Sequence, residues 1–293
     1  MKVHFLSHLK TSPLVKGFKI FKIQALCWFL YAVVTPALIA QDADEIWTLE
    51  KVLQRHAQAH GDAALRQNLK SIRIRGHIVS PQGNYDMVLI KKRPQLARMT
   101  LFLPEGLRKV RAYDGDLVWE MVDQYDAALE PEKQVLPPDE AQIFIRDSRF
   151  LGHLLESETS GLKLEFVGRS YVNPREELLH SPTASGTESD KTASLKESIE
   201  CFHLRDASSD KSRIEFFLDT ETFLEVKIIS QKWDGETWQN YEHYLSDYRD
   251  LGPIQGAFRV DTYHNGNFHS GLRVDAVNFN IGIYSEYFSL HYD

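Results

Sequence analysis

The sequence has very few cysteines and no long apolar segment. Only Cys27 and Cys201 are cysteines among 293 residues, and Cys27 lies in the N-terminal leader described below, so we expect no intramolecular disulfide in the mature chain. Cys201 lies in a stretch of alternating apolar residues, which favours a buried, inert thiol. The apolar run at residues 25–34 is shorter than the roughly 20 residues that a membrane-spanning helix needs.

Basic residues are also scarce. The chain holds 34 Lys and Arg residues against 41 Asp and Glu residues, which gives a net charge of −7. Five of the lysines and none of the acids lie in residues 1–40, so the chain without this segment carries a charge of −12. Because no cluster of Lys or Arg offsets this charge, we expect neither nucleic acid nor an anionic membrane surface as a partner.

Motifs of common catalytic sites are missing. The sequence contains no G-x-S-x-G nucleophile elbow, no phosphate-binding loop, no G-x-G-x-x-G turn and no H-E-x-x-H zinc pair. Acidic residues are numerous but scattered, and no pair has a spacing that marks a glycosidase site. An active site needs several convergent groups, so we predict that the protein is not an enzyme and has no cofactor.

Two pairs of histidines stand out in the sequence. His56 and His60 are four residues apart on a predicted helix, a spacing that can hold a metal ion. No third ligand is identifiable in the sequence, and a packed or solvent-facing pair is the simpler alternative, so we predict no metal site. His264 and His269 flank an Asn-Gly-Asn turn, which favours an ordinary role at a turn or strand end.

Residues 1–40 have the order of a secretory signal peptide. Lysines from Lys2 to Lys22 precede the apolar run, and small residues up to Ala40 precede an acidic stretch. We predict cleavage after Ala40, export to the periplasm and no stable membrane span after cleavage. A retained N-terminal anchor is the alternative. Cys27 lacks the small preceding residue of a lipoprotein signal, so we expect no lipid attachment.

The mature chain of about 250 residues fits one large domain rich in strands or two small ones. Apolar residues at three- and four-residue spacing predict a helix over 46–68, divisible at Gly61-Asp62, and another over 138–155. Elsewhere the apolar period is two, and tight turns join the segments, which predicts an antiparallel meander. The expected strands are 72–79, 85–92, 96–103, 109–113, 117–121, 162–166, 199–204, 213–218, 223–231, 238–248, 256–263 and 271–278.

Residues 173–198 differ from the segments on either side. They are rich in Ser, Thr, Glu, Lys and Pro and poor in large apolar side chains. Such a composition buries too little surface to order itself, so we predict a flexible insertion within a single domain that spans residues 41–293.

Five segments carry a family resemblance. They are the helix-to-strand stretch 57–76, the Asp-Gly turn followed by Trp at 113–119, the D-x-x-T hairpin at 217–224, the Asp-Tyr-Arg stretch at 246–249 with Gly252-Pro253, and the closing strand at 274–280 with Phe288. Together they span most of the mature chain, and in this order they resemble the LolA-like superfamily of outer-membrane lipoprotein-sorting proteins and lipoprotein carriers. The chain is longer than the carriers, and no residue matches their functional arginine.

The resemblance implies a mainly β, α+β fold, in which helices cover the concave face of a half-open, strongly curved antiparallel β-sheet (an incomplete barrel). In the family this cavity shelters an acyl chain or another apolar ligand. The chain is therefore expected to be a periplasmic carrier or binding protein for a lipid, a lipoprotein acyl chain or a similar ligand, with a lipoprotein or envelope protein as a further partner. The alternative is a non-catalytic envelope interaction protein whose interior is filled by its own side chains.

Apolar residues at every second position of two predicted strands are the candidates for lining the cavity, because alternate residues of a strand face the same side. Methionine and aromatic side chains suit a cavity that adapts to flexible chains. The alternative is that these side chains pack against the covering helices, as apolar stripes commonly do. The six candidates are Met99, Leu101, Leu103, Leu117, Trp119 and Met121.

Overall fold

The computed structural model describes residues 46–124, 133–157, 161–173, 198–209 and 212–291. One compact unit begins at Trp47 and contains all the described elements. The predicted leader, residues 1–40, and nearly all of the predicted insertion, residues 173–198, lie outside the described residues. No helix in the described ranges has the length and apolar character needed to cross a membrane.

The first predicted helix is divided at the expected place. Helix α1 spans Leu49–Ala59 and helix α2 spans Ala63–Gln67. Gly61 between them has a φ of +101°, which favours glycine, and the side chain of Asp62 caps α2 by accepting hydrogen bonds from two backbone amides.

The second predicted helix is shorter than expected. Helix α3 spans Pro138–Asp147, and Ser148 caps its C-terminus, whereas the prediction extended to residue 155. The following segment turns instead, with Gly152 at a φ of +94°. The apolar residues at 150–155 have a helix-like spacing, but they belong to a turn that packs onto the sheet, so the last two turns of the predicted helix were wrong.

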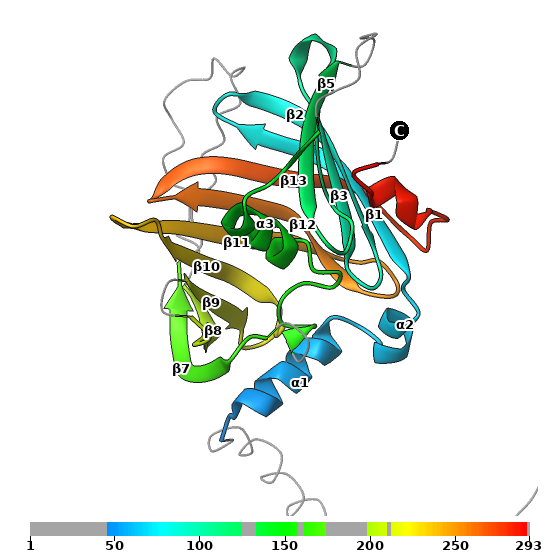
Figure 1. Cartoon of the computed structure of the whole chain (residues 1–293). Helices are drawn as coiled ribbons and strands as arrows, with labels where there is room; N and C mark the ends of the chain where they lie inside the picture. Colours follow the sequence, from blue (N-terminus) through cyan, green and yellow to red (C-terminus); the bar gives the residue numbers. More distant parts are fainter. Residues whose placement is uncertain (1–45, 125–132, 158–160, 174–197, 210–211, 292–293) are drawn as a thin grey trace, which may run out of the picture. The chain divides into compact units, whose positions relative to one another are not determined.

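The strands form one continuous antiparallel sheet, as predicted (Figure 1). Its order is β6-β5-β4-β3-β2-β1-β13-β12-β11-β10-β9-β8-β7, and β1 pairs with β13 to join the two runs of strands. The strands are β1 (Ser71–Ser80), β2 (Gly83–Lys92), β3 (Leu96–Phe102), β4 (Leu107–Tyr113), β5 (Val118–Gln124), β6 (Lys133–Val135), β7 (Leu164–Val172), β8 (Ile199–Asp206), β9 (Ser212–Asp219), β10 (Glu225–Trp233), β11 (Trp238–Asp250), β12 (Gln255–His264) and β13 (Asn267–Phe279).

The sheet is curved and open within the described ranges, because β6 and β7 end it without pairing with each other (Figure 1). Strand β6 was not predicted, since three residues are too few to show a period. Strands β7 and β8, on either side of the predicted insertion, pair with each other from Val172 and Ile199 onward. The insertion therefore connects two neighbouring strands.

The core is divided among several clusters. Val52 of α1 packs with Phe202, Leu204 and Phe216 on β8 and β9, and Phe144 of α3 packs with Ala97 and Val118 on β3 and β5. The short 3-10 helix η2 (Ser285–Phe288) packs Phe288 against Ile90 and Leu96. A second 3-10 turn, η1 (Pro104–Gly106), joins β3 to β4.

Candidate functional site: an apolar cavity with a polar end

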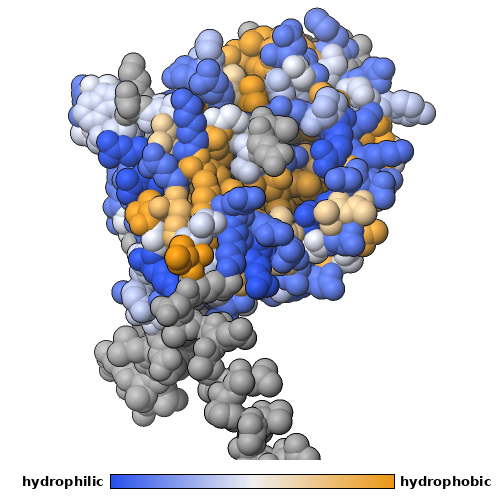
Figure 2. All heavy atoms as spheres, turned by 90° about the horizontal axis from the view of Figure 1, so that it is seen from below, coloured by the Kyte–Doolittle hydropathy of each residue, from blue (hydrophilic) through white to orange (hydrophobic). Residues whose placement is uncertain are grey.

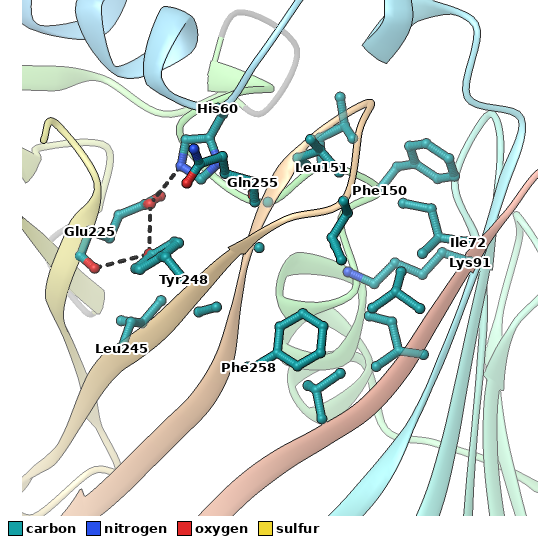
Figure 3. Close-up of a pocket in the computed structure, with 18 of the residues that line it drawn as sticks. His60, Ile72, Lys91, Phe150, Leu151, Glu225, Leu245, Tyr248, Gln255 and Phe258 are labelled. Atoms are coloured by element: carbon teal, nitrogen blue, oxygen red, sulfur yellow. Dashed lines mark hydrogen bonds and ion pairs between the residues drawn. The ribbon is translucent and has the colours of Figure 1, made fainter. Parts of the chain in front are cut away.

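A cavity of about 270 Å³ lies over the middle of the sheet. Its walls come from strands β1, β2 and β9 to β13, from the end of α1 and from the turn that follows α3. Most of its lining is apolar, including Ile72, Phe150, Leu151, Leu245 and Phe258 (Figure 3). Apolar walls with a few converging polar groups are typical of a ligand site.

The surface view agrees with an apolar hollow on this side of the unit. In Figure 2, which looks from below Figure 1, apolar side chains gather in the middle of the face and polar side chains surround them. A contiguous apolar area with a polar rim is a common feature of binding sites.

Lys91 is a cation inside the apolar wall (Figure 3). Its Nζ donates a hydrogen bond to the carbonyl oxygen of Arg149 at 2.6 Å. Burial lowers the pKa of Lys91 to about 8, although the carboxylates of Glu156 and Asp147 oppose this shift. At neutral pH the amine is still mostly charged, so it can pair with an anionic group in the cavity.

His153 is a second titratable group of the wall. Its Nδ1 is buried and makes no hydrogen bond within the described ranges, and its ring lies 6.0 Å from that of Phe216. Burial lowers the pKa of His153 to about 4, with Asp147 opposing the shift. The imidazole is therefore neutral at neutral pH and adds to the apolar character of the wall.

A polar cluster lies at one end of the cavity (Figure 3). His56 lies in the last turn of α1 and His60 caps that helix, so the two side chains share one side of the helix end. Glu225, the first residue of β10, reaches both histidines. Its Oε2 lies 3.0 Å from His60 Nε2, and its Oε1 lies 3.4 Å from His56 Nε2.

The backbone fixes the orientation of both imidazole rings. His56 Nδ1 lies 2.9 Å from the carbonyl oxygen of Phe223, and His60 Nδ1 lies 3.0 Å from that of Gln255. Because a carbonyl oxygen only accepts, each Nδ1 carries a hydrogen and donates it. Both Nε2 atoms are therefore turned towards Glu225.

The three groups shift one another's pKa. Burial lowers the pKa of His56, and the charge of Glu225 offsets this only in part. Burial would lower the pKa of His60 too, but its hydrogen bond to Glu225 and the charge of Glu225 raise it. Burial would raise the pKa of Glu225, yet the two histidines lower it to about 2. These shifts favour the ionised form of Glu225, the protonated form of His60 and the neutral form of His56.

Tyr248 completes the polar end (Figure 3). Its hydroxyl donates to the backbone carbonyl of Glu225 at 2.9 Å and lies 3.3 Å from Glu225 Oε2. Burial, followed by the charge of Glu225, raises the pKa of Tyr248 well above its usual value, so the side chain stays a neutral hydroxyl.

The six residues predicted to line a cavity lie elsewhere, and none belongs to the wall of this one. In the strand register Met99 pairs with Arg111 and Arg111 with Glu120, whereas Trp119 pairs with Ala112. Directly paired residues point to the same side, so Met99 and Trp119 face opposite sides of the sheet. A contact of any of the six with a ligand stays a prediction.

Each of the six has a definite environment. Met99 packs beside α3, and Leu101, on the same strand side, is half-buried. Trp119 and Met121 are buried with Val110 and Ala112, and Leu117 packs against that cluster. The indole Nε1 of Trp119 donates to the carbonyl oxygen of Phe288 at 2.9 Å. Leu103 is half-buried and lies just beyond the end of β3.

Sequence reasoning found part of the polar cluster. The spacing of His56 and His60 was noted, but Glu225 lies 165 residues from His60 along the chain. Only the pairing of α1 with the turn before β10 brings the carboxylate to the helix, and nothing local to Glu225 indicates this. Lys91 and His153 gave no signal either, since both sit in ordinary apolar patterns.

No protein-family model and no curated protein matches the chain. Solved structures with the same fold include a DUF1329 family protein from Desulfovibrio piger, with a TM-score of 0.53, 8% identity and coverage of 84% of this chain and 98% of that chain. A putative outer membrane lipoprotein-sorting protein domain from Vibrio parahaemolyticus has a TM-score of 0.50 and 12% identity, covering 82% and 96%. A LolA superfamily protein from Nitrosomonas europaea has a TM-score of 0.50 and 11% identity, covering 84% and 100%.

At 8–12% identity these likenesses establish the fold and nothing finer. They agree with the fold that the five sequence segments predicted. The chain has a LolA-like fold.

Proposed function

We propose that the protein is a periplasmic carrier or binding protein for a lipid, an acyl chain of a lipoprotein or a similar apolar ligand. The cavity over the middle of the sheet is the observation that supports the proposal most strongly, because its lining is mainly apolar and it opens to the surface. The two structural neighbours from the LolA-like superfamily support a carrier or binding role rather than catalysis.

The wall of the cavity supports an adaptable ligand. Every residue of strands β10 and β11 keeps some exposed surface, so this part of the wall offers side-chain surface that a ligand could cover. The volume of about 270 Å³ is close to the lower limit of roughly 300 Å³ for typical ligand sites, and an acyl chain can extend beyond the cavity into the apolar area around it.

The helices and the turn after α3 close the concave side of the sheet in this proposal. Val52 of α1 and Phe144 of α3 both contact sheet residues, and Phe150 to His153 form part of the wall. A short turn that carries Gly152 can move more easily than a helix, so it is the part that admits a ligand.

The amine of Lys91 supports a ligand with an acidic end. It is a cation within the apolar wall, and its Nζ donates a hydrogen bond to the backbone carbonyl of Arg149. A carboxylate or phosphate beside it would gain a charge-assisted hydrogen bond in a medium of low dielectric constant.

Titration with a fluorescent fatty acid tests the function. The wild-type protein is expected to bind the acid and to bind the matching fatty alcohol less tightly, because only the acid can pair with Lys91. Lys91→Met should remove this difference while keeping the apolar contacts. A wild-type protein that binds neither probe contradicts the proposal.

The second candidate is an interaction protein of the cell envelope with a filled interior, and the sealed packing around Trp119 favours it for that part of the sheet. Mass spectrometry of organic extracts from the purified protein separates the two. A carrier should retain lipid from the cell, whereas a docking protein should release none above the level of a control protein purified in the same way.

A further inference from the structure

One nitrogen of the polar cluster faces an unfavourable partner. His56 is completely buried, and its Nε2 makes no hydrogen bond in the described part of the chain. The nearest carboxylate oxygen is Glu225 Oε1, 3.4 Å away. Because the carbonyl oxygen of Phe223 can only accept, one hydrogen of the His56 ring is on Nδ1, and Nε2 faces the carboxylate of Glu225. Such a contact is unfavourable in a buried site unless a second proton or a metal ion lies between the two atoms.

We propose that His56, His60 and Glu225 bind a divalent transition-metal ion, with Zn²⁺ as the best match. Two imidazole nitrogens and one carboxylate oxygen form a known zinc donor set, with the fourth position left to water or another ligand. Ca²⁺ and Mg²⁺ prefer oxygen ligands only and fit this set poorly.

The spacing of the three ligand atoms fits the proposal. Zinc bonds of about 2.0–2.1 Å in a tetrahedral arrangement separate neighbouring ligand atoms by about 3.3 Å. The two Nε2 atoms lie 3.0 Å and 3.4 Å from the oxygens of Glu225, and all three ligand atoms lie within 4.8 Å of one another. Small side-chain movements therefore suffice to bring them around one ion.

The surroundings orient the two histidines as metal ligands. In metal sites the ring nitrogen that does not bind the ion usually donates to a carbonyl or carboxylate. Both Nδ1 atoms do so here, to the carbonyl oxygens of Phe223 and Gln255. Phe223 lies two residues before β10 and Gln255 is the first residue of β12, so the sheet holds the rings in place.

Nearby charges affect the expected affinity of the site for a metal ion. The positive charge of Arg66 acts on both histidines and opposes a dication, while the carboxylate of Glu225 compensates for it. His60, Glu225 and Tyr248 also line the cavity, so the proposed site borders the space that a ligand would enter (Figure 3). The inference rests on three side chains alone and stands whether or not the cavity binds lipid.

The alternative is a purely structural cluster, in which a shared proton links His60 to Glu225 and ties α1 to strands β10 and β12. The metal site and the structural cluster both predict that the three residues stabilise the fold. Only the metal site predicts stoichiometric, saturable binding of an ion.

Titration of the chelator-treated full-length protein with ZnCl₂ by calorimetry tests the site. The wild-type chain is expected to bind one Zn²⁺, and Co²⁺ in its place should give the visible spectrum of a tetrahedral nitrogen and oxygen site. Glu225→Gln and His60→Asn should each weaken the affinity by at least about 100-fold, since loss of even an outer partner of a ligand costs roughly 10–100-fold.

A second histidine–glutamate pair provides the matched control. His203 Nε2 lies 2.8 Å from Glu215, a contact of the same chemistry that belongs to no group of three metal-ligating side chains in the described residues. His203→Asn should therefore leave Zn²⁺ binding unchanged. Zn²⁺ should also raise the melting temperature of the wild-type and control proteins but not of the two ligand variants. Absence of one-to-one binding by the wild-type protein overturns the proposal, whatever the variants do. So does binding that both ligand variants retain.

Discussion

Two regions of the same sheet are packed in different ways. In strands β3 to β5, here the sealed region, Val110, Ala112 and Trp119 have no exposed surface, and both sides of the strands carry packed clusters. In strands β10 to β13, here the open region, β10 and β11 have no fully buried residue, and the cavity lies against them. Apolar residues make up 13 of the 21 residues of β3 to β5 and 19 of the 45 residues of β10 to β13, so the sealed region is also the more apolar one.

The two regions also differ in what packs against each side of their strands. In the sealed region α3 packs against Ala97 and Val118, and the C-terminal segment around Phe288 packs against the opposite side. In the open region the facing turn, Phe150 to His153, leaves space. The comparison shows that an apolar strand can line a binding cavity only where the helices and turns packed on it leave part of it uncovered.

The largest expected effect is in the sealed region. Trp119→Ala removes a fully buried indole and its hydrogen bond to Phe288, so we expect a loss of about 3–5 kcal/mol of unfolding free energy. Leu245→Ala, in the wall of the cavity, should cost clearly less and change ligand affinity instead. Urea denaturation of both variants measures this, and equal losses at the two sites would contradict the division into two regions.

His153 is expected to contribute to the loss of stability at acidic pH. Its folded-state pKa of about 4 lies below the ordinary value of 6.5, so the unfolded chain binds the proton more readily. Stability should therefore fall as the pH drops from 6.5 to 4, by up to about 3 kcal/mol from this group. His153→Phe keeps an aromatic ring beside Phe216 and should remove this part of the acid loss. Denaturation curves at several pH values compare the two proteins, and identical pH profiles would contradict the prediction.

Lys91 should change stability in the same direction as His153, but in an alkaline pH window. Its pKa of about 8 in the folded chain lies below 10.5, so its burial costs stability at pH 8 and below, and this cost disappears as the pH rises towards 10.5. Lys91→Met should raise the unfolding free energy at pH 7 by about 1–2 kcal/mol, because loss of the hydrogen bond to Arg149 offsets part of the gain. A destabilised variant would show that the amine supports the wall rather than serving a ligand.

The smallest effect is expected at Leu101, which was predicted from the sequence to line a cavity. It is half-buried and lies outside the wall of the cavity described above. A core position would lose about 2–5 kcal/mol on Leu101→Ala, so we expect a smaller loss here. If fatty-acid affinity also changes, the apolar wall extends along β3, and if it does not, the ligand stays within the open region.

The architecture could be predicted from the sequence because each strand carries the same local pattern of alternating residues. Alternation of apolar and polar residues gave nearly every strand, and the Gly61-Asp62 break in the first helix was correctly located. The end of α3 was missed because Phe150 and Leu154 keep a helical spacing in a segment that turns at Gly152.

The site could be predicted only in part, because it depends on distant contacts. Met99 and Trp119 belong to similar stripes, yet the register places them on opposite sides of the sheet, which no single strand reveals. Glu225 joins His56 and His60 only through the packing of α1 against the start of β10. A cavity forms where other segments leave a strand partly uncovered, so the sequence of the strand alone does not reveal it.

Lipid retained by the purified protein tests the central claim most directly. Leu245→Trp would fill part of the cavity, and Val167→Trp, at an exposed position of β7 away from it, is the matched control. Mass spectrometry of organic extracts should find lipid with the wild-type and Val167→Trp proteins and much less with Leu245→Trp. No lipid with the wild-type protein, or equal amounts with all three, would contradict the carrier function of the open region.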